Sequence, residues 1–427
     1  MTSPAAVREV PWATEHLGLA LTQVSSTTGM TIADLVEPGL RRNPRRAHLL
    51  VSTVLGKHVP TDPLTIISAG ERLGDLVAGL LGADSDAVVL GFAETATGLG
   101  HCVAARLSAP CYLHSTRRDV PAIGTSAGFE EGHSHATSHQ LQPTSAELFA
   151  NDRPLVLVDD EISTGATALD AIRALHALTP RSRYVVASLV DMRTQEHAVA
   201  VDAVADELGV RIDSVSLAAG RTELPEGLIE SVGALPDPVL NPVGSRTGTV
   251  ERIDIAWPAA VPEGGRHGFL RADAQRFGRA VESAAAALGE QLDPARPVIV
   301  VGHEELMYLP LRIAESLAAT GRRVRFQTTT RSPAYVLDEP GYPLRRGFCF
   351  TAPEAGEDQP RYLYNAEWPG EDAVVLAIVD AAADTGRLTA DGGLLDVLTA
   401  AGADVVLAVV SGADPVSLRA ARIGASS

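Results

Sequence analysis

The chain has 427 residues, more than one ordinary domain holds, and 45% of them are apolar, so we expect two or three packed domains. No run approaches the ~18 consecutive apolar residues of a membrane span. The formal net charge of −18 argues against general nucleic-acid binding, and the three cysteines (Cys102, Cys111 and Cys349) form no CxxC pair, which indicates a reducing compartment and no structural zinc.

The first 60 residues are expected to be mainly helical, and they are basic in places. Their start, MTSPAAVREVPW, lacks the apolar stretch of a secretory signal, which favours a cytoplasmic protein. They contain the chain's single lysine, Lys57, although Lys and Arg together number 35. Lysine is a common point-charge ligand of phosphate, so Lys57 is a candidate anion binder. Chance survival of one lysine in an arginine-rich chain is the alternative.

Strand and helix patterns alternate after residue 60. We expect helices at 69–81, through 104–107, and at 168–178 and 304–317, and strands at 87–90, 111–114, 155–158, 184–190, 212–217, 298–301, 324–328, 374–379 and 405–409. This alternation predicts mostly parallel sheets covered by helices, with ligands at the carboxyl ends of the strands. A stretch rich in Pro and Gly at 236–268 predicts a linker with a short strand in it.

The strongest local pattern is LVLVDDEISTGAT at residues 155–167. Four apolar residues predict a buried strand, Asp159 and Asp160 stand where it ends, and a short loop then leads into a helix. This loop consists of Ser163, Thr164, Gly165, Ala166 and Thr167. A hydroxyl-rich loop at a helix N-terminus offers backbone N–H groups to a phosphate, and two adjacent carboxylates can accept hydrogen bonds from a ribose diol and support Mg²⁺. An incidental Asp-rich strand end is the alternative.

This run resembles the loop with which type I phosphoribosyltransferases bind 5-phosphoribosyl 1-diphosphate (PRPP). The resemblance implies an α/β fold of that type, a central mostly parallel sheet with a hood. It implies that Asp159 and Asp160 hold the ribose and, together with PRPP, the Mg²⁺ cofactor, while the loop from Ser163 to Thr167 holds the 5′-phosphate. It also implies a pyrophosphate loop after an earlier strand, which consists of Glu94, Thr95, Ala96 and Thr97. Lys57 is a further implied pyrophosphate ligand, placed where it touches both substrates.

The segment between the third strand and the PRPP strand corresponds to the mobile catalytic loop of that family. The resemblance implies that its basic groups close over the pyrophosphate, exclude water and stabilise the leaving group. These groups are Arg117, Arg118, His133 and His135. The run HSHATSH is also compatible with a zinc site, and each histidine with a solvated loop that has no role. Candidates for the acceptor side are His58, His139 and Arg331.

Three further runs are similar to a narrower family, the phosphoribosyltransferases encoded with tellurite-resistance (stress) gene clusters: NPRRAHLLVSTVLGKHVPTDP, GFAETATGLGH and HSHATSH. The C-terminal domain of that family is named for a Thr-Arg-Ser-Pro (TRSP) motif, which residues 330–333 provide. The resemblance covers residues 40–410. It implies a hood at 1–60, a catalytic phosphoribosyltransferase domain at 61–235, a linker at 236–268 and a TRSP-type α/β domain at 269–427.

The C-terminal region repeats the order of these motifs. Gly91-x-x-Glu94 recurs as Gly302-x-x-Glu305, Ser115-Thr116-Arg117 as Thr329-Thr330-Arg331, and LVLVDDEISTG as LAIVDAAADTG at 376–386. In the last pair Asp159 corresponds to Asp380, Asp160 to Ala381 and Ser163 to Asp384. We therefore expect a degenerate copy of the same fold that does not turn over PRPP, because a carboxylate there repels phosphate. Generic α/β alternation is the alternative.

The sequence thus favours an enzyme, a pentosyltransferase of nucleotide metabolism that moves a 5-phosphoribosyl group from PRPP to a small-molecule acceptor, such as a nitrogen heterocycle, and releases pyrophosphate. A non-catalytic regulatory protein of the same fold that binds PRPP or a nucleotide is the alternative. A PRPP synthetase is disfavoured because no added ATP-recognition motif is apparent. We expect no nucleic-acid or membrane partner, and either a homodimer or one chain whose two domains form a pseudo-dimer.

Overall fold

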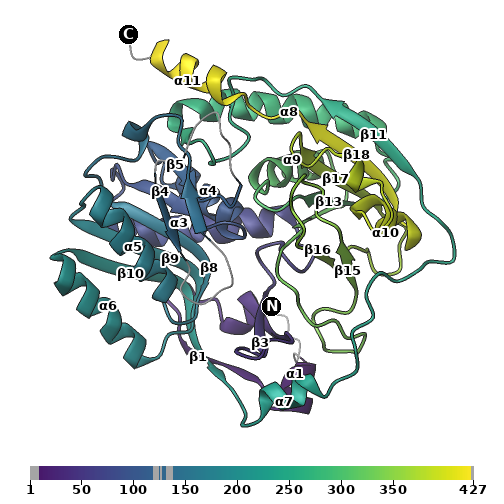
Figure 1. The fold of residues 1–427 in the computed structure, drawn as a ribbon, viewed down its shortest axis with the longest axis horizontal. Coiled ribbons are helices and arrows are strands. Elements are labelled where there is room, and N and C mark those ends of the chain that lie inside the picture. Colours follow the sequence, from purple (N-terminus) through teal and green to yellow (C-terminus); the bar gives the residue numbers. More distant parts are fainter. Residues whose placement is uncertain (1–8, 119–124, 126, 131–137, 425–427) are drawn as a thin grey trace, which may run out of the picture.

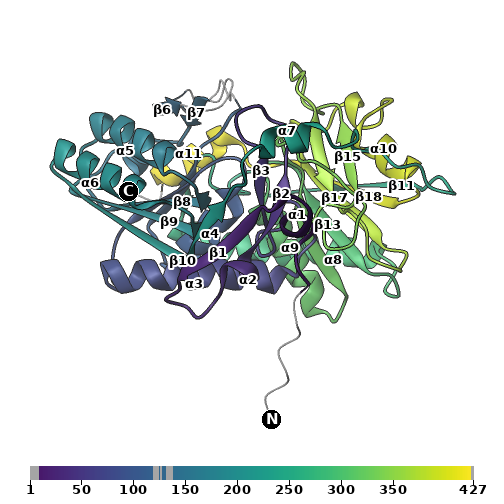
Figure 2. The same ribbon diagram turned by 90° about the horizontal axis from the view of Figure 1, so that it is seen from below.

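The computed structural model describes residues 9–118, 125, 127–130 and 138–424. Within them the chain forms two α/β units that lie side by side, one coloured purple to teal and the other green to yellow (Figure 1). Seen after a 90° turn, the short elements α1, β2, β3 and α7 lie between the two sheets (Figure 2). None of the described helices is long and apolar enough to cross a membrane.

The first unit is built on a seven-stranded sheet with the order β1-β10-β9-β8-β4-β5-β12. The five inner strands run parallel, and the edge strands β1 and β12 pair antiparallel. The strands are β1 (Ala20–Ser25), β4 (Val88–Gly91), β5 (Cys111–His114), β8 (Leu155–Ile162), β9 (Arg183–Asp191), β10 (Arg211–Glu223) and β12 (Phe269–Leu270). The helices are α3 (Pro63–Leu81), α4 (Ala96–Arg106), α5 (Ala166–Leu178), α6 (Gln195–Leu208) and α7 (Leu228–Gly233), and a small hairpin consists of β6 (Ala127–Glu130) and β7 (Ser138–Leu141).

Strand β8 illustrates why these residues form the centre of the sheet. Leu155 and Leu157 pack into the hydrophobic cluster on one face, and Val156 and Val158 into the cluster on the other. A strand covered on both faces needs apolar side chains at every position, and parallel sheets have this pattern. The strand continues to Ile162, beyond the apolar run predicted from the sequence, because it stays paired with β9.

Residues 9–60 are not mainly helical, so the prediction is wrong for this described part of the segment. The described part of this segment, residues 9–60, holds two short helices, α1 (Trp12–Leu17) and α2 (Ile32–Leu35), the edge strand β1, and a hairpin of β2 (Val36–Leu40) and β3 (His48–Ser52). The hairpin packs into a hydrophobic cluster with three tyrosines of the second unit, Tyr335, Tyr342 and Tyr364. Packing against distant residues therefore decides the structure of this segment, since strand formation depends strongly on such context.

The second unit has a wholly parallel sheet with the order β11-β18-β17-β13-β14. Its strands are β11 (Val250–Ile255), β13 (Val298–Gly302), β14 (Val324–Thr328), β17 (Val374–Asp380) and β18 (Asp404–Val410), with a separate hairpin of β15 (Gly347–Phe350) and β16 (Arg361–Tyr364). Its helices are α8 (Ala274–Gln291), α9 (Tyr308–Ala319), α10 (Leu394–Ala400) and α11 (Pro415–Gly424). The helix predicted from residue 304 begins only at Tyr308, because a tight turn precedes it in which Leu306 N donates to His303 O at 3.0 Å.

The segment 236–268, predicted to be a linker, is shared between the two sheets. It contains the expected strand, β11, which forms an edge of the second sheet. The chain then returns to the first unit, where His114 N donates to Gly265 O at 3.2 Å and β12 extends the first sheet. The segment is therefore a structural part of both units rather than a free connection.

The two sheets share the arrangement of their central strands. The order β9-β8-β4-β5 of the first sheet matches the order β18-β17-β13-β14 of the second, and all of these strands run parallel. The first sheet has β1 and β12 in addition. Beside β18, β11 takes the place that β10 has beside β9, although β11 precedes the other strands of its sheet in the sequence. The strand order thus agrees with the repeat expected from the motifs.

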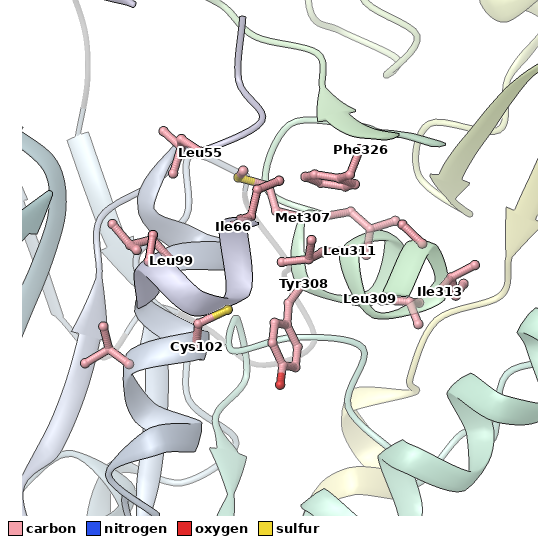
Figure 3. Packing of buried hydrophobic residues seen from close by; sticks show 14 of the residues in the cluster. Leu55, Ile66, Leu99, Cys102, Met307, Tyr308, Leu309, Leu311, Ile313 and Phe326 are labelled. Atoms are coloured by element: carbon pink, nitrogen blue, oxygen red, sulfur yellow. The ribbon is translucent and has the colours of Figure 1, made fainter. Parts of the chain in front are cut away.

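The two units share one hydrophobic core. Helix α9 packs against α3 and α4, and side chains of both units meet there (Figure 3): Leu55, Ile66, Leu99 and Cys102 from the first, and Met307, Tyr308, Leu311 and Phe326 from the second. A Cβ added to Gly98 would lie 3.1 Å from Met307 Cβ, so a glycine permits this close approach. The continuous core means that the units are not independent bodies on a flexible connection.

Candidate functional site

A cavity of about 830 Å³ lies at the carboxyl ends of β4 and β8. This is the edge of a parallel sheet where ligands are expected, and the volume suits a small molecule. The turn of the β2–β3 hairpin, the loops after β4 and β8 and the TRSP motif form its walls. The lining residues are Arg41, Asn43, Pro44, Arg45, Arg46, Lys57, Phe92, Ala93, Glu94, Thr95, Arg117, residues 159–168, Arg331 and Ser332.

The acidic pair and the loop after it lie together in this cavity, as the sequence predicts. Asp160 N donates to Asp159 Oδ1 at 2.9 Å, and Glu161 N donates to Asp160 Oδ1 at 3.1 Å, so backbone groups orient both carboxylates. Gly165, with a φ of +83°, then turns the chain into α5. The five loop residues from 163 to 167 all line the cavity. Carboxylates beside a helix N-terminus can together bind a phosphorylated sugar.

Lys57 lies at the acidic pair, with Nζ 3.8 Å from Asp160 Oδ2. The pair is mostly shielded, because the two side chains are 15% and 21% exposed. This places the only lysine of the chain where the resemblance to type I enzymes predicts a contact with the substrates.

The turn of the hood hairpin supplies cavity residues that the sequence analysis did not assign to the site. Arg41, Asn43, Arg45 and Arg46 line the cavity, and Arg46 donates to Glu161 Oε1 at 2.7 Å. Burial, and then the charge of Arg46, lower the pKa of Arg41 to about 10, so it still carries its charge at neutral pH. The basic run RRNPRR of a strongly acidic chain was the signal that pointed to this cluster.

The predicted pyrophosphate loop contributes only in part. Glu94 and Thr95 line the cavity, whereas Ala96 and Thr97 do not. Ala96 is fully buried, and Thr97 is directed to the domain interface, where Oγ1 donates to Glu305 O at 3.1 Å. The carboxylate of Glu94 accepts a hydrogen bond from Arg331 N at 2.9 Å and so belongs to the same interface.

The two arginines predicted to close over the pyrophosphate lie in different places. Arg117 lines the cavity, and its backbone N donates to Glu305 Oε1 at 2.8 Å. Arg118 does not line the cavity: it extends into the second unit, donates to Asp380 Oδ2 at 2.7 Å and also pairs with Glu354. Arg118 therefore lies away from the cavity in this structure, because buried carboxylates of the other unit hold its guanidinium.

The histidines contribute less than predicted. His133 and His135 lie outside the described residues. His139 is fully buried against Ser115, with Nδ1 2.7 Å from its hydroxyl, and does not line the cavity. His58 is also buried, stacks edge-on against Tyr364, and its ring nitrogens have no hydrogen-bond partner among the described residues. Of the three acceptor-side candidates, only Arg331 reaches the cavity.

A separate buried cluster in the second unit brings His303, Glu304 and Glu354 close enough to hold a metal ion. Arginines already neutralise its carboxylates: Arg331 donates to Glu304 at 3.0 Å, Arg361 also pairs with Glu304, and Arg118 pairs with Glu354. Such a cluster is an ion-pair network rather than a set of open metal ligands.

Comparisons with known proteins agree with this architecture. A family model described as phosphoribosyl transferase matches residues 35–221, and one described as the TRSP domain C-terminal to it matches residues 263–398. No curated protein matches the chain significantly.

Similar solved structures include adenine phosphoribosyltransferase from Trypanosoma brucei, 16% identical over 44% of this chain and 77% of that one, with a TM-score of 0.34. Orotate phosphoribosyltransferase from Aeropyrum pernix is 22% identical over 48% of this chain and 96% of that one, with a TM-score of 0.27. The two family models match in succession over the first and the second unit, and the chain therefore belongs to the phosphoribosyl transferases that carry a C-terminal TRSP domain.

Proposed function

We propose that the chain transfers the 5-phosphoribosyl group of PRPP to a small-molecule acceptor and releases pyrophosphate. One observation carries the proposal: a single cavity contains the adjacent carboxylates of Asp159 and Asp160, the N-terminus of α5 at Gly165 and the ammonium group of Lys57. The 5′-phosphate would accept hydrogen bonds from backbone N–H groups of the loop, and the ribose hydroxyls would donate to the two carboxylates.

In the proposed reaction, the bond between ribose C1 and the pyrophosphate oxygen breaks, and a bond between C1 and a nucleophilic nitrogen of the acceptor forms. Positive charge develops on the sugar and negative charge on the leaving pyrophosphate. Arg117 and Lys57 line the cavity as cations that can stabilise the leaving group, so a protein nucleophile is not required. The turn of the hood hairpin forms one wall of the cavity, and exclusion of water there would strengthen these charge interactions.

We also propose that the reaction uses Mg²⁺. The donors fit, because Asp159 and Asp160 present oxygen ligands at the cavity, and Mg²⁺ prefers oxygen and is commonly held by carboxylates together with substrate phosphates. When bound, Mg²⁺ would neutralise part of the charge of the pyrophosphate.

The acceptor is proposed to be a nitrogen heterocycle that enters from the hood side. A second cavity of about 200 Å³ lies there and shares Arg45 and Arg46 with the main cavity. Its other walls include His48 and the apolar side chains of Leu224, Leu228 and Ile229. We further propose a cytoplasmic protein that acts in nucleotide metabolism alongside tellurite-resistance functions.

The test is release of pyrophosphate from PRPP and Mg²⁺ in the presence of a panel of heterocyclic acceptors. The double variant Asp159→Asn, Asp160→Asn should release none, because it keeps the shape of both side chains but removes their negative charges and replaces one acceptor oxygen of each by an NH2 donor. Asp202→Asn, on the exposed face of α6, is the matched control and should keep the activity. Turnover at the wild-type rate in the double variant would exclude the proposal.

A non-catalytic PRPP-binding protein is the second candidate. One observation favours it: Arg118, expected to close over the pyrophosphate, is instead held in the second unit. Calorimetric binding of PRPP without pyrophosphate release on any acceptor of the panel would support this candidate against the enzyme.

A further inference from the structure

Two glutamates at corresponding positions of the two units reach across the interface in opposite directions. Glu94, after β4, accepts hydrogen bonds from Arg331 N at 2.9 Å and from the hydroxyl of Thr330. Glu305, after β13, accepts hydrogen bonds from Arg117 N at 2.8 Å and from Thr116 Oγ1 at 2.7 Å. Each unit therefore holds the Thr-Arg pair of the other with a buried carboxylate.

The turns that present these Thr-Arg pairs are alike as well. Ser115 N donates to Gly91 O at 3.0 Å, and Thr329 N donates to Gly302 O at the same distance. One step later, Arg118 N donates to Thr116 Oγ1 at 3.0 Å, and Ser332 N donates to Thr330 Oγ1 at 3.1 Å. Reciprocal contacts of this kind are the mark of a two-fold interface, in which residue i contacts j and j contacts i. The two units thus meet as the subunits of a dimer do.

The two turns differ at the residue after the Thr-Arg pair, where Arg118 corresponds to Ser332. Ser332 is small and lines the PRPP cavity of the first unit. Arg118 instead extends into the second unit and pairs with Asp380 and Glu354, with only 10% of its side chain exposed. Asp380 matches Asp159 in the alignment of the motifs. The strand register instead places it level with Asp160, two residues beyond the partner of the glycine that ends the neighbouring strand. Asp380 thus corresponds to one of the two acids of the first unit's cavity. The guanidinium of Arg118 therefore occupies the place where a sugar would bind in the second unit.

The charges around this arginine make the arrangement a stable one. Burial by itself would raise the pKa of Asp380, but Arg118 and then Arg266 outweigh it and hold that pKa below its ordinary value. Glu305 behaves alike: burial raises its pKa, and Arg266 and Arg118 together lower it to about 2. Both carboxylates are therefore ionised at neutral pH, and withdrawal of Arg118 would leave these buried charges with Arg266 as their remaining arginine partner.

We propose that the TRSP domain is a permanent internal partner subunit of the first unit. Arg118 of the first unit fills the former substrate position of the TRSP domain. Arg118 and Glu305 together position Arg117 in the single working cavity. The chain geometry supports this, because Glu305 fixes the backbone N of Arg117 while the next residue is held at Asp380. Arg118 and Glu305 are thus positioning residues that act through Arg117. The identity of the ligand as PRPP rests on the proposed function, but the contact of Arg118 with the second unit does not.

The test uses a variant that removes the whole ion-pair group, Arg118→Met with Asp380→Asn and Glu354→Gln, so that no buried charge is left without a partner. The matched control is Arg323→Met with Glu371→Gln, an exposed ion pair of the same unit. Calorimetry with PRPP and Mg²⁺ should give one site per chain for the wild type, at least tenfold weaker binding for the first variant and unchanged binding for the control. Two sites per chain in the wild type, or wild-type affinity in the variant, would overturn the proposal.

A double-mutant cycle separates positioning from general damage to the structure. If Arg118 acts through Arg117, the triple change should cause no further loss of PRPP affinity when Arg117→Met is already present. Full additivity of the two losses would contradict positioning. Hydrogen exchange gives a readout that does not depend on PRPP: the amides of residues 116–118 should exchange faster in the triple variant than in the control. Absence of PRPP binding by the wild type would refute the proposed function, whereas unchanged exchange would refute the contact itself.

Discussion

Gly165 offers a sharp test of the phosphate loop. Its φ of +83° lies in the left-handed region, where a side chain costs about 1–2 kcal/mol. An added Cβ would lie 3.3 Å from Arg193 Cδ and 3.6 Å from Ile162 Cγ2. Arg193 cannot easily yield, because its guanidinium is bound to Asp191 through contacts of 2.6–3.2 Å. Gly165→Ala should therefore destabilise the protein by about 2 kcal/mol and displace the N–H groups of the loop.

Binding and stability are to be measured separately. Urea denaturation gives the loss of unfolding free energy, and calorimetry with PRPP and Mg²⁺ should give a Kd at least about tenfold higher, since each 1.4 kcal/mol of lost contact is a factor of ten. Gly209→Ala is the matched control: Gly209 has a φ of +65° at the end of α6, and an added Cβ would meet nothing within 4 Å. It should lose similar stability but no affinity. Equal PRPP affinity in the two variants would refute the reasoning.

Three further predictions concern other groups. Lys57→Met should raise the Kd for PRPP about 10- to 100-fold in calorimetry, because a charge-assisted contact of about 1.5–3 kcal/mol is lost, while urea denaturation should detect little change; an unaltered Kd would remove Lys57 from the site. Burial lowers the pKa of His114 to about 4, so its ring stays neutral in the folded chain while the unfolded chain takes up a proton below about pH 6.5. The free energy of unfolding is therefore unaffected by His114 above pH 6.5 and decreases as the pH falls toward 4, by about 2 kcal/mol at pH 5. His114→Gln should weaken this pH dependence in urea denaturation, and an identical slope would contradict the assignment. Burial raises the pKa of Cys102 and of Cys111 to about 12, so iodoacetamide at pH 8 should modify the half-buried Cys349 first. Mass spectrometry gives the order of labelling, and earlier labelling of Cys102 or Cys111 would contradict this prediction.

The inner strands of both sheets were predictable because their side chains are apolar on both faces. Runs such as 155–158 and 374–379 admit few other interpretations when helical patterns lie between them. The order DD-STG-T at the end of such a strand also predicted that the acidic pair and the loop lie together, and both line one cavity. Local sequence determines these features, so local reasoning was sufficient.

The hood and the interface depend on distant residues and escaped local reasoning. The hairpin at 36–52 is stabilised by tyrosines almost 300 residues away, beginning at Tyr335, and nothing near it in the sequence indicates them. The location of Arg118 likewise depends on Asp380 and Glu354. Their roles became apparent only through the three-dimensional arrangement, even though the repeated motifs had already indicated that the two units correspond.

Strands β11 and β12 have a consequence for how the chain is made. β11 precedes β12 in the sequence, yet β11 belongs to the second sheet and β12 to the first. During synthesis β5 therefore stays without its edge partner until β12, which ends at residue 270, has been made. Likewise, β11 leaves the ribosome long before its neighbour β18 has been synthesised. A gene fragment that ends at residue 262, just before the TRSP match, would carry β11 without its sheet and would lack β12. The two halves are interlaced through these strands, so neither can be lost or exchanged by a single cut without leaving an open sheet edge, which is a site for aggregation.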